Sequence, residues 1–154
     1  NLGEYIAENF KEKEFILWDG CCKYHNNIKI NEIYELKEKY PNSKILVHPE
    51  CQKQIRDIAD YIGSTAGIIN YATNNDYKDY IIATEEGILY ELKKKNPDKN
   101  FYIPGGSISC VDMKKTTLNN LYDTLLNMKN EVILDESVSK NALKCLENMH
   151  SLAK

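Results

Sequence analysis

The chain has 154 residues, 42% of them hydrophobic and 28% charged, which suits one domain, or one complete domain with part of another, folding without disulfides. Its formal net charge of -3 argues against sequence-independent binding to nucleic acid, because such binding needs a basic surface. Its apolar runs fall short of the roughly 18 residues that a membrane-spanning helix requires, so we expect no membrane partner.

The predicted elements alternate between short strands and amphipathic helices. The strand candidates are β-branched and aromatic runs, and the helix candidates place apolar residues three or four positions apart. In chain order we predict a strand at 14–18, a helix at 29–40, a strand at 44–48, helices at 50–62 and 64–73, a strand at 80–84, a helix at 85–96, a strand at 100–104, and helices at 116–128 and 135–154. This alternation is typical of an α/β fold with a parallel sheet covered by helices on both faces.

Side chains that could take part in catalysis or metal binding follow each predicted strand. In parallel sheets, ligands bind at the carboxyl ends of the strands, so these side chains should lie along one edge. They are Cys21, Cys22 and His25 after the first strand, His48, Glu50 and Cys51 after the second, Thr84 and Glu85 after the third, and Ser109 and Cys110 after the fourth.

The five cysteines form an odd number, which fits a reducing cytoplasm. Thiolates from different strands can bind one soft metal ion or an iron–sulfur cluster, whereas the lack of a C-x-x-C pair argues against a zinc ribbon. Because Cys22 and Cys110 are far apart in the sequence, spacing alone favours simple burial for both. Cys145 has the helical spacing of a core residue beside Leu143 and Leu146.

The polar candidates each allow two interpretations. His25 and His48 are either general acids and bases or buried, hydrogen-bonded side chains. Glu50 either shares their cleft or interacts with the dipole of a helix that starts beside it. In the string "GSTAG", Ser64 and Thr65 either bind a carboxylate or phosphate at a helix start or simply cap that helix.

Seven strings cover nearly all of the chain in a fixed order: "NLGEYIAE", "ILWDGCCKYH", "YPNSKILVHPEC", "ADYIGSTAGIINY", "ATEEGILYELKKKNPDK", "CVDMKKTTL" and "EVILDE". Together they resemble the quinolinate synthase family of NAD biosynthesis. The resemblance implies three similar three-layer α/β/α sandwich domains around a pseudo-threefold axis, each giving one cysteine to a 4Fe–4S cluster. It also implies a cytoplasmic, transferase-type enzyme that uses the cluster as a Lewis acid to condense iminoaspartate with dihydroxyacetone phosphate into quinolinate.

The resemblance also implies roles for particular residues. Cys22 and Cys110 match the second and third cluster cysteines, while Cys51 is expected to pack beside the site. Catalytic and substrate-binding roles fall on His25, His48 and Glu50, and further substrate contacts on Ser64 and Thr65. Two positions depart from the family pattern, because Cys21 replaces an apolar residue and Val111 a proline. The first departure leaves open whether Cys21 or Cys22 binds iron.

The strings begin inside the family pattern, so we expect the C-terminal half of such an enzyme. The expected parts are the end of a preceding α/β domain (1–20), one complete α/β/α domain (21–110) and a C-terminal helical segment (111–154). The remaining cluster cysteine, the first in chain order, should then come from the N-terminal half, and this chain alone should be inactive. The alternatives are a non-catalytic α/β module and a zinc-dependent hydrolase that uses His25, His48 and Glu50.

Overall fold

The structure of the chain is a computed structural model that describes residues 1–153. The chain divides into two compact units, Asn1–Val111 and the residues from Asp112 onward, and each is considered by itself. Lys154, the last residue of the predicted C-terminal helix, lies outside the described residues.

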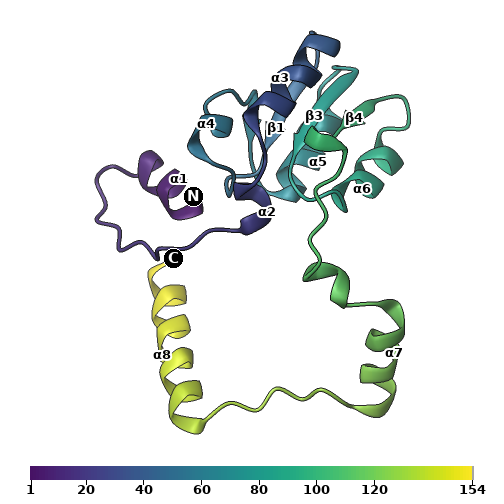
Figure 1. Cartoon of the computed structure of the whole chain (residues 1–154). Helices are drawn as coiled ribbons and strands as arrows, with labels where there is room; N and C mark the ends of the chain where they lie inside the picture. Colours follow the sequence, from purple (N-terminus) through teal and green to yellow (C-terminus); the bar gives the residue numbers. More distant parts are fainter. Residues whose placement is uncertain (154) are drawn as a thin grey trace. The chain divides into compact units, whose positions relative to one another are not determined.

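The first unit is built on a four-stranded parallel sheet (Figure 1). Its strands are β1 (Lys44–Val47), β2 (Tyr61–Ile62), β3 (Asp79–Ala83) and β4 (Asn100–Tyr102), in the order β2-β1-β3-β4. In the register, Val47 pairs with Ile62 on one side and with Ala83 on the other, so the carboxyl ends of β1, β2 and β3 are level. The predicted strands at 44–48, 80–84 and 100–104 are confirmed.

Helices lie on both sides of this sheet and confirm the three-layer α/β/α arrangement (Figure 1). The connections carry α3 (Ile30–Lys39), α4 (Lys53–Arg56), α5 (Thr65–Asn74) and α6 (Ile88–Lys95), and a 3-10 turn, η1 (Pro104–Gly106), follows β4. Two further helices, α1 (Leu2–Asn9) and α2 (Lys23–Asn26), were not predicted. The predicted helices at 29–40 and 64–73 are confirmed.

The core lies between the sheet and its helices. Leu46, Ile81 and Ile82 have no exposed surface, since both faces of the sheet are covered. From the helices, Ile33 and Leu92 pack into the same cluster. Removing this much apolar surface from water is the main stabilising contribution to the unit.

The predicted strand at 14–18 is wrong. This segment has no regular structure, and the side chains of Ile16 and Trp18 are 98% and 90% exposed. No strand of the described residues pairs with it. A strand without a neighbour leaves its backbone donors and acceptors unpaired, so apolar composition is not enough to form one.

The predicted helix at 50–62 is also largely wrong, because helix forms only over α4 and the segment ends as β2. Asp60 explains the change. Its backbone N–H donates to the carbonyl of Ile45 at 2.9 Å, and its carboxylate accepts from the N–H of Ile45 at 2.8 Å. These two bonds fix Tyr61 and Ile62 beside β1, where sheet pairing outweighs the helical pattern.

The predicted helix at 85–96 begins three residues late, at Ile88. Glu85 precedes it in a turn, where its carboxylate accepts a hydrogen bond from the N–H of Gly87 at 2.7 Å. The pattern of an acid early and lysines late holds from Glu91 to the last turn of α6.

The second unit contains η2 (Met113–Lys115), α7 (Leu118–Asn127) and α8 (Glu136–Leu152), which confirms both predicted terminal helices. Thr117 and Asn120 form a capping box at the start of α7, and Asp135 caps α8. Cys145 is exposed on α8, so the prediction that it fills a core is wrong. No helix among residues 1–153 is long and apolar enough to cross a membrane.

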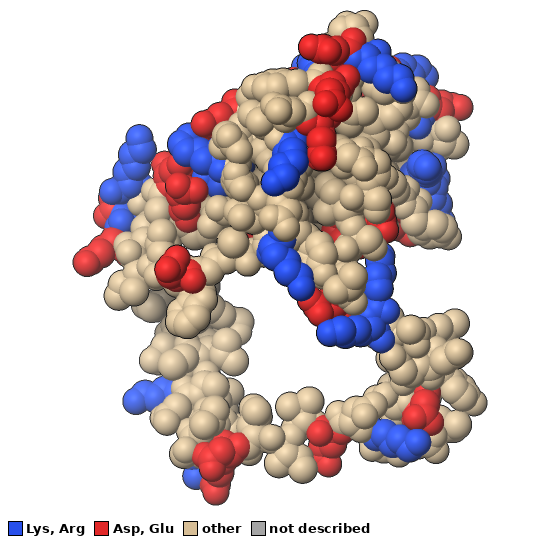
Figure 2. All heavy atoms as spheres, in the orientation of Figure 1, with Lys and Arg blue, Asp and Glu red and all other residues tan. Residues whose placement is uncertain are grey.

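The surface of the first unit carries both signs of charge. On the face drawn in Figure 2, the side chains of Lys and Arg alternate with those of Asp and Glu and do not gather into one basic area. Several are paired, for example Lys44 with Asp60 at 2.7 Å.

Candidate functional site

The short helix α2 carries two of the predicted site residues to the carboxyl edge of the sheet. Cys22 is its N-cap residue and His25 lies within it, three positions later, on the same side of the turn. The Nδ1 atom of His25 lies 3.2 Å from the Sγ atom of Cys22. Its Nε2 atom lies 2.9 Å from the Oγ1 atom of Thr84, the residue that follows β3. The expected position at the sheet edge is therefore reached without the expected strand before it.

The turn after β1 supplies the next two residues. The carboxylate of Glu50 lies 3.0 Å from Nδ1 of His25 and 3.6 Å from Nδ1 of His48. The two imidazole rings are stacked, with centroids 4.6 Å apart and planes 22° apart. Because α4 begins only at Lys53, Glu50 is not at a helix start, and the interpretation as a residue at a helix dipole is wrong.

Burial sets the electrostatics of this group. Loss of hydration lowers the pKa of His25, and the nearby His48 lowers it further, while the Glu50 carboxylate acts in the opposite direction. Burial also lowers the pKa of His48. Both rings therefore favour the neutral form, in which an imidazole can accept or donate a proton.

Cys110 is tied to the same edge through its backbone. Its N–H donates to the carboxylate of Glu85 at 3.3 Å, and the N–H of Val111 donates to the hydroxyl of Tyr24 in α2 at 3.0 Å. Glu85 is buried and follows Thr84, the partner of His25. These contacts bring the segments that carry Cys22 and Cys110 to one edge of the sheet.

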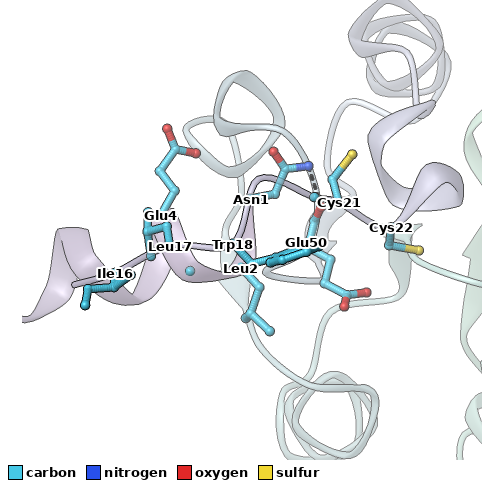
Figure 3. A pocket seen from close by; sticks show the side chains of 11 residues that line it. Asn1, Leu2, Glu4, Ile16, Leu17, Trp18, Cys21, Cys22 and Glu50 are labelled. Carbon is cyan, nitrogen blue, oxygen red and sulfur yellow. Dashed lines mark hydrogen bonds between the residues drawn. The ribbon is translucent and has the colours of Figure 1, made fainter.

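Besides Cys110, three cysteines lie near this edge, and they differ in their surroundings. Cys21 is exposed and Cys22 half-buried, and their side chains point in different directions (Figure 3). Both line a pocket of about 600 Å³ that Glu50 also borders. Cys51 is fully buried, burial raises the pKa of its thiol to about 12, and the thiol donates to the carbonyl of Ala83. Cys51 therefore packs beside the site, as the sequence indicated.

Ser64 and Thr65 lie at the start of α5. Ser64 is the N-cap residue, and its Oγ atom accepts a hydrogen bond from the N–H of Gly67 at 3.1 Å. Both side chains are exposed, and β2, which leads into α5, is the neighbour of β1. The capping interpretation is thus confirmed, and the pair stands at the same sheet edge as the other candidates.

Sequence reasoning missed the residues that hold the turn after β1. The side-chain amide of Asn1 donates to the carbonyl of Glu50 at 2.9 Å and to the side chain of Asn26 at 3.0 Å. The buried guanidinium of Arg56 donates to the carbonyl of Cys51 at 2.8 Å and pairs with Glu4 at 2.9 Å. No local pattern marks these residues, because their partners lie far away in the sequence.

Three side chains offer converging ligand atoms for a metal ion. The candidate ligand atoms of Cys22, His25 and Glu50 all lie within 4.8 Å of one another. His48 belongs to the predicted zinc triad but not to this group, and Cys22 stands in its place. The group combines sulfur, nitrogen and oxygen donors, which suits thiophilic transition metals and not Ca²⁺ or Mg²⁺.

Comparisons with known proteins match nearly the whole chain. Residues 1–151 match the family model described as quinolinate synthetase A protein. The chain is 68% identical over 153 residues to the quinolinate synthase of Clostridioides difficile, 52% identical over 153 residues to that of Clostridium novyi and 47% identical over 157 residues to that of a Sulfurihydrogenibium species. Each match covers 99% of this chain, and the chain spans about half the length of these relatives.

Proposed function

The chain belongs to the quinolinate synthetase A protein family, and on that premise we propose that it supplies the C-terminal half of a quinolinate synthase. The whole enzyme would act in NAD biosynthesis and condense iminoaspartate with dihydroxyacetone phosphate to quinolinate. Its partner would be the N-terminal half of the same enzyme, in a reducing cytoplasm. The observation that carries the proposal is the convergence of Cys22, His25 and Glu50 at the carboxyl edge of a parallel sheet.

Two thiols are suited to hold part of a 4Fe–4S cluster. Cys22 and Cys110 are free and half-buried, and their segments are joined through Thr84, Glu85 and Tyr24. Cysteine thiolates are the usual ligands of such clusters, so the donor set fits. When bound, the cluster would supply an iron Lewis acid, and its remaining cysteine ligand would come from the N-terminal half. We assign iron binding to Cys22 in preference to Cys21, because the sulfur of Cys22 lies 3.2 Å from Nδ1 of His25 within the candidate site, whereas Cys21 is exposed.

The other residues would handle protons and substrate anions. Glu50 lies within hydrogen-bond distance of His25, so a proton can pass between its carboxylate and that ring, while Nδ1 of His48 accepts from the backbone N–H of Glu50. Thr84 fixes the orientation of the His25 ring from the opposite side. At the start of α5, Ser64 and Thr65 would bind carboxylate or phosphate oxygens through their hydroxyls and the adjacent amides.

We further propose the division of the chain that the family pattern indicates. Residues 1–20 would complete a preceding α/β domain, 21–110 would form one complete repeat of the pseudo-threefold enzyme, and 111–154 would form its C-terminal helical segment. All four strands of the parallel sheet lie within residues 21–110, which supports the assignment of this segment as one complete repeat.

Anaerobic reconstitution with iron and sulfide tests the proposal. The chain alone should fail to keep a stable four-iron complement, since it offers two of three thiolates. Mixed with the N-terminal half of the Clostridioides difficile relative, it should hold the cluster and form quinolinate. A stable four-iron cluster on the lone chain, or no cluster in the mixture, would refute the assignment.

Serine variants supply the matched controls in the mixture. Cys22→Ser and Cys110→Ser should each abolish the four-iron complement, whereas Cys145→Ser should keep it, because Cys145 lies exposed on α8. Cys21→Ser decides between the two adjacent thiols. Loss of the cluster in Cys21→Ser but not in Cys22→Ser would reverse our assignment.

A further inference from the structure

We infer that Cys22, His25 and Glu50 form a binding site for a single thiophilic divalent cation, with Zn²⁺ as the best-suited ion. The site requires neither Cys110 nor a second chain. It differs from the proposed cluster in its ligands, which are one thiolate, one imidazole and one carboxylate, and in its content of one ion.

The distances between the donor atoms are close to those around a bound zinc ion. Zn–S bonds of about 2.3 Å and Zn–N and Zn–O bonds of about 2.0–2.2 Å in a tetrahedron place the donors roughly 3.3–3.6 Å apart. Here Nδ1 of His25 lies 3.2 Å from the sulfur of Cys22 and 3.0 Å from the carboxylate of Glu50. These two separations need to lengthen by only a few tenths of an ångström, and the sulfur of Cys22 lies within 4.8 Å of the carboxylate oxygen of Glu50.

The partner of the other ring nitrogen favours ligation. Thr84 is 1% exposed, and its hydroxyl lies 2.9 Å from Nε2 of His25. A metal ion on Nδ1 requires the tautomer in which Nε2–H donates a hydrogen bond, and the hydroxyl oxygen of Thr84 is placed to accept it. The ion then takes the place of the protons between Nδ1, the thiol and the carboxylate, and these protons pass to solvent. Metal-bound histidines are regularly held in this way by a hydrogen bond to their second nitrogen.

The site also has room for a fourth ligand. Cys22 and Glu50 are half-buried and line the pocket of about 600 Å³ described above. Water can therefore reach an ion held by the three side chains and complete a tetrahedron (Figure 3).

One consequence rests on the proposed function. Because the single ion would occupy the thiolate of Cys22, zinc and the cluster would exclude each other. A chain loaded with zinc should then accept iron and sulfide only after the zinc is removed by a chelator.

Cobalt and zinc titrations of the reduced, chelator-treated chain test the site without iron. We expect one ion per chain and, with Co²⁺, a thiolate-to-metal charge-transfer band. Cys22→Ser should remove the band and weaken Zn²⁺ binding more than about 100-fold, since loss of a ligand exceeds the 10–100-fold typical of outer-shell changes. Thr84→Val, which keeps all three ligands, should weaken binding by about 10–100-fold.

Glu50→Gln provides a second ligand variant at a half-buried position, and circular dichroism establishes that each variant is folded. Cys21→Ser and Cys110→Ser are the matched controls and should retain the band and the stoichiometry. The proposal is overturned if the chain shows no charge-transfer band, if Cys22→Ser binds as tightly as the unchanged chain, or if Cys110→Ser abolishes binding. Each of these results is independent of whether the mixture with the N-terminal half assembles a cluster.

Discussion

The helices of the first unit and those of the second have similar amphipathic sequences but different surroundings. In the first unit, α3, α5 and α6 each bury apolar side chains, among them Ile33, Ile68 and Leu92. No residue of α7 or α8 is buried, and their order comes from caps and from pairs such as Glu136 with Lys140. The difference teaches that a helical pattern predicts a helix but not what covers its apolar face.

The largest effect is expected from a pair of Leu→Ala substitutions, one in each unit. Leu46→Ala removes a fully buried side chain from β1 and should lower the free energy of unfolding by about 2–5 kcal/mol. Leu146→Ala removes a 52% exposed side chain from α8 and should change it by less than about 0.5 kcal/mol. Urea unfolding followed by circular dichroism measures both. Equal losses would show that α8 is as well packed as the sheet.

A second pair compares hydroxyl groups. Thr84→Val removes the partner of the buried His25 ring and should cost about 1–3 kcal/mol, because Nε2 is left without its hydrogen bond. Thr124→Val in α7 removes a contact with the exposed Asn130 side chain and should cost less than about 0.5 kcal/mol. The same unfolding measurement applies. A neutral Thr84→Val would mean that the His25 ring finds another partner or water.

The pH dependence of stability should also differ between the two units. Burial lowers the pKa of His25 and His48 from 6.5, so the unfolded chain binds more protons than the folded one just below that pH. The first unit should therefore be most stable above pH 6.5 and lose stability as the pH falls through the lowered pKa values.

Unfolding measured across this pH range tests the direction. His48→Gln should reduce the slope, and His150→Gln, at an exposed position of α8, should leave it unchanged. A slope that persists in full after both His25→Gln and His48→Gln would contradict the assignment.

The smallest expected effect is local to α8. Hydrogen bonds from the Ser137 hydroxyl and from the N–H groups of Val138 and Ser137 lower the pKa of Asp135. The charged cap therefore stabilises the helix start above the ordinary Asp pKa and is lost as the pH falls through the lowered one. The protection factor of the Ser137 amide, which is the intrinsic exchange rate at each pH divided by the measured rate, should fall on acidification, and Asp135→Asn should remove that dependence. An unchanged protection factor would show that Asp135 contributes little to the cap.

The sheet was largely predictable because its information is local. The runs at 44–48 and 80–84 are apolar on both faces and end in polar residues, as buried parallel strands do. The apolar run at 14–18 looked similar, yet it is irregular, since a strand exists only where a neighbour accepts its hydrogen bonds. For the same reason, Tyr61 and Ile62 became a strand against their helical pattern.

The site was predictable in its residue types and its place but not in its contacts. Position after a strand correctly placed His48 and Thr84 at the carboxyl edge. The pairing of Glu50 with His25, the stacking of the two imidazoles and the buried clamp of Arg56 had no sequence signal. Each joins segments whose separation along the chain gives no information about their distance in space.

The sequence by itself therefore determined the alternation of strands and helices, the cap at Ser64 and the edge of the sheet where the candidate residues gather. These features were predictable because periodicity and capping act between near neighbours in the chain. Only the tertiary structure decided that Cys22, His25 and Glu50 meet and that Cys145 is exposed. Those outcomes depend on which distant surfaces pack together and exclude water, and packing is a property of the whole fold.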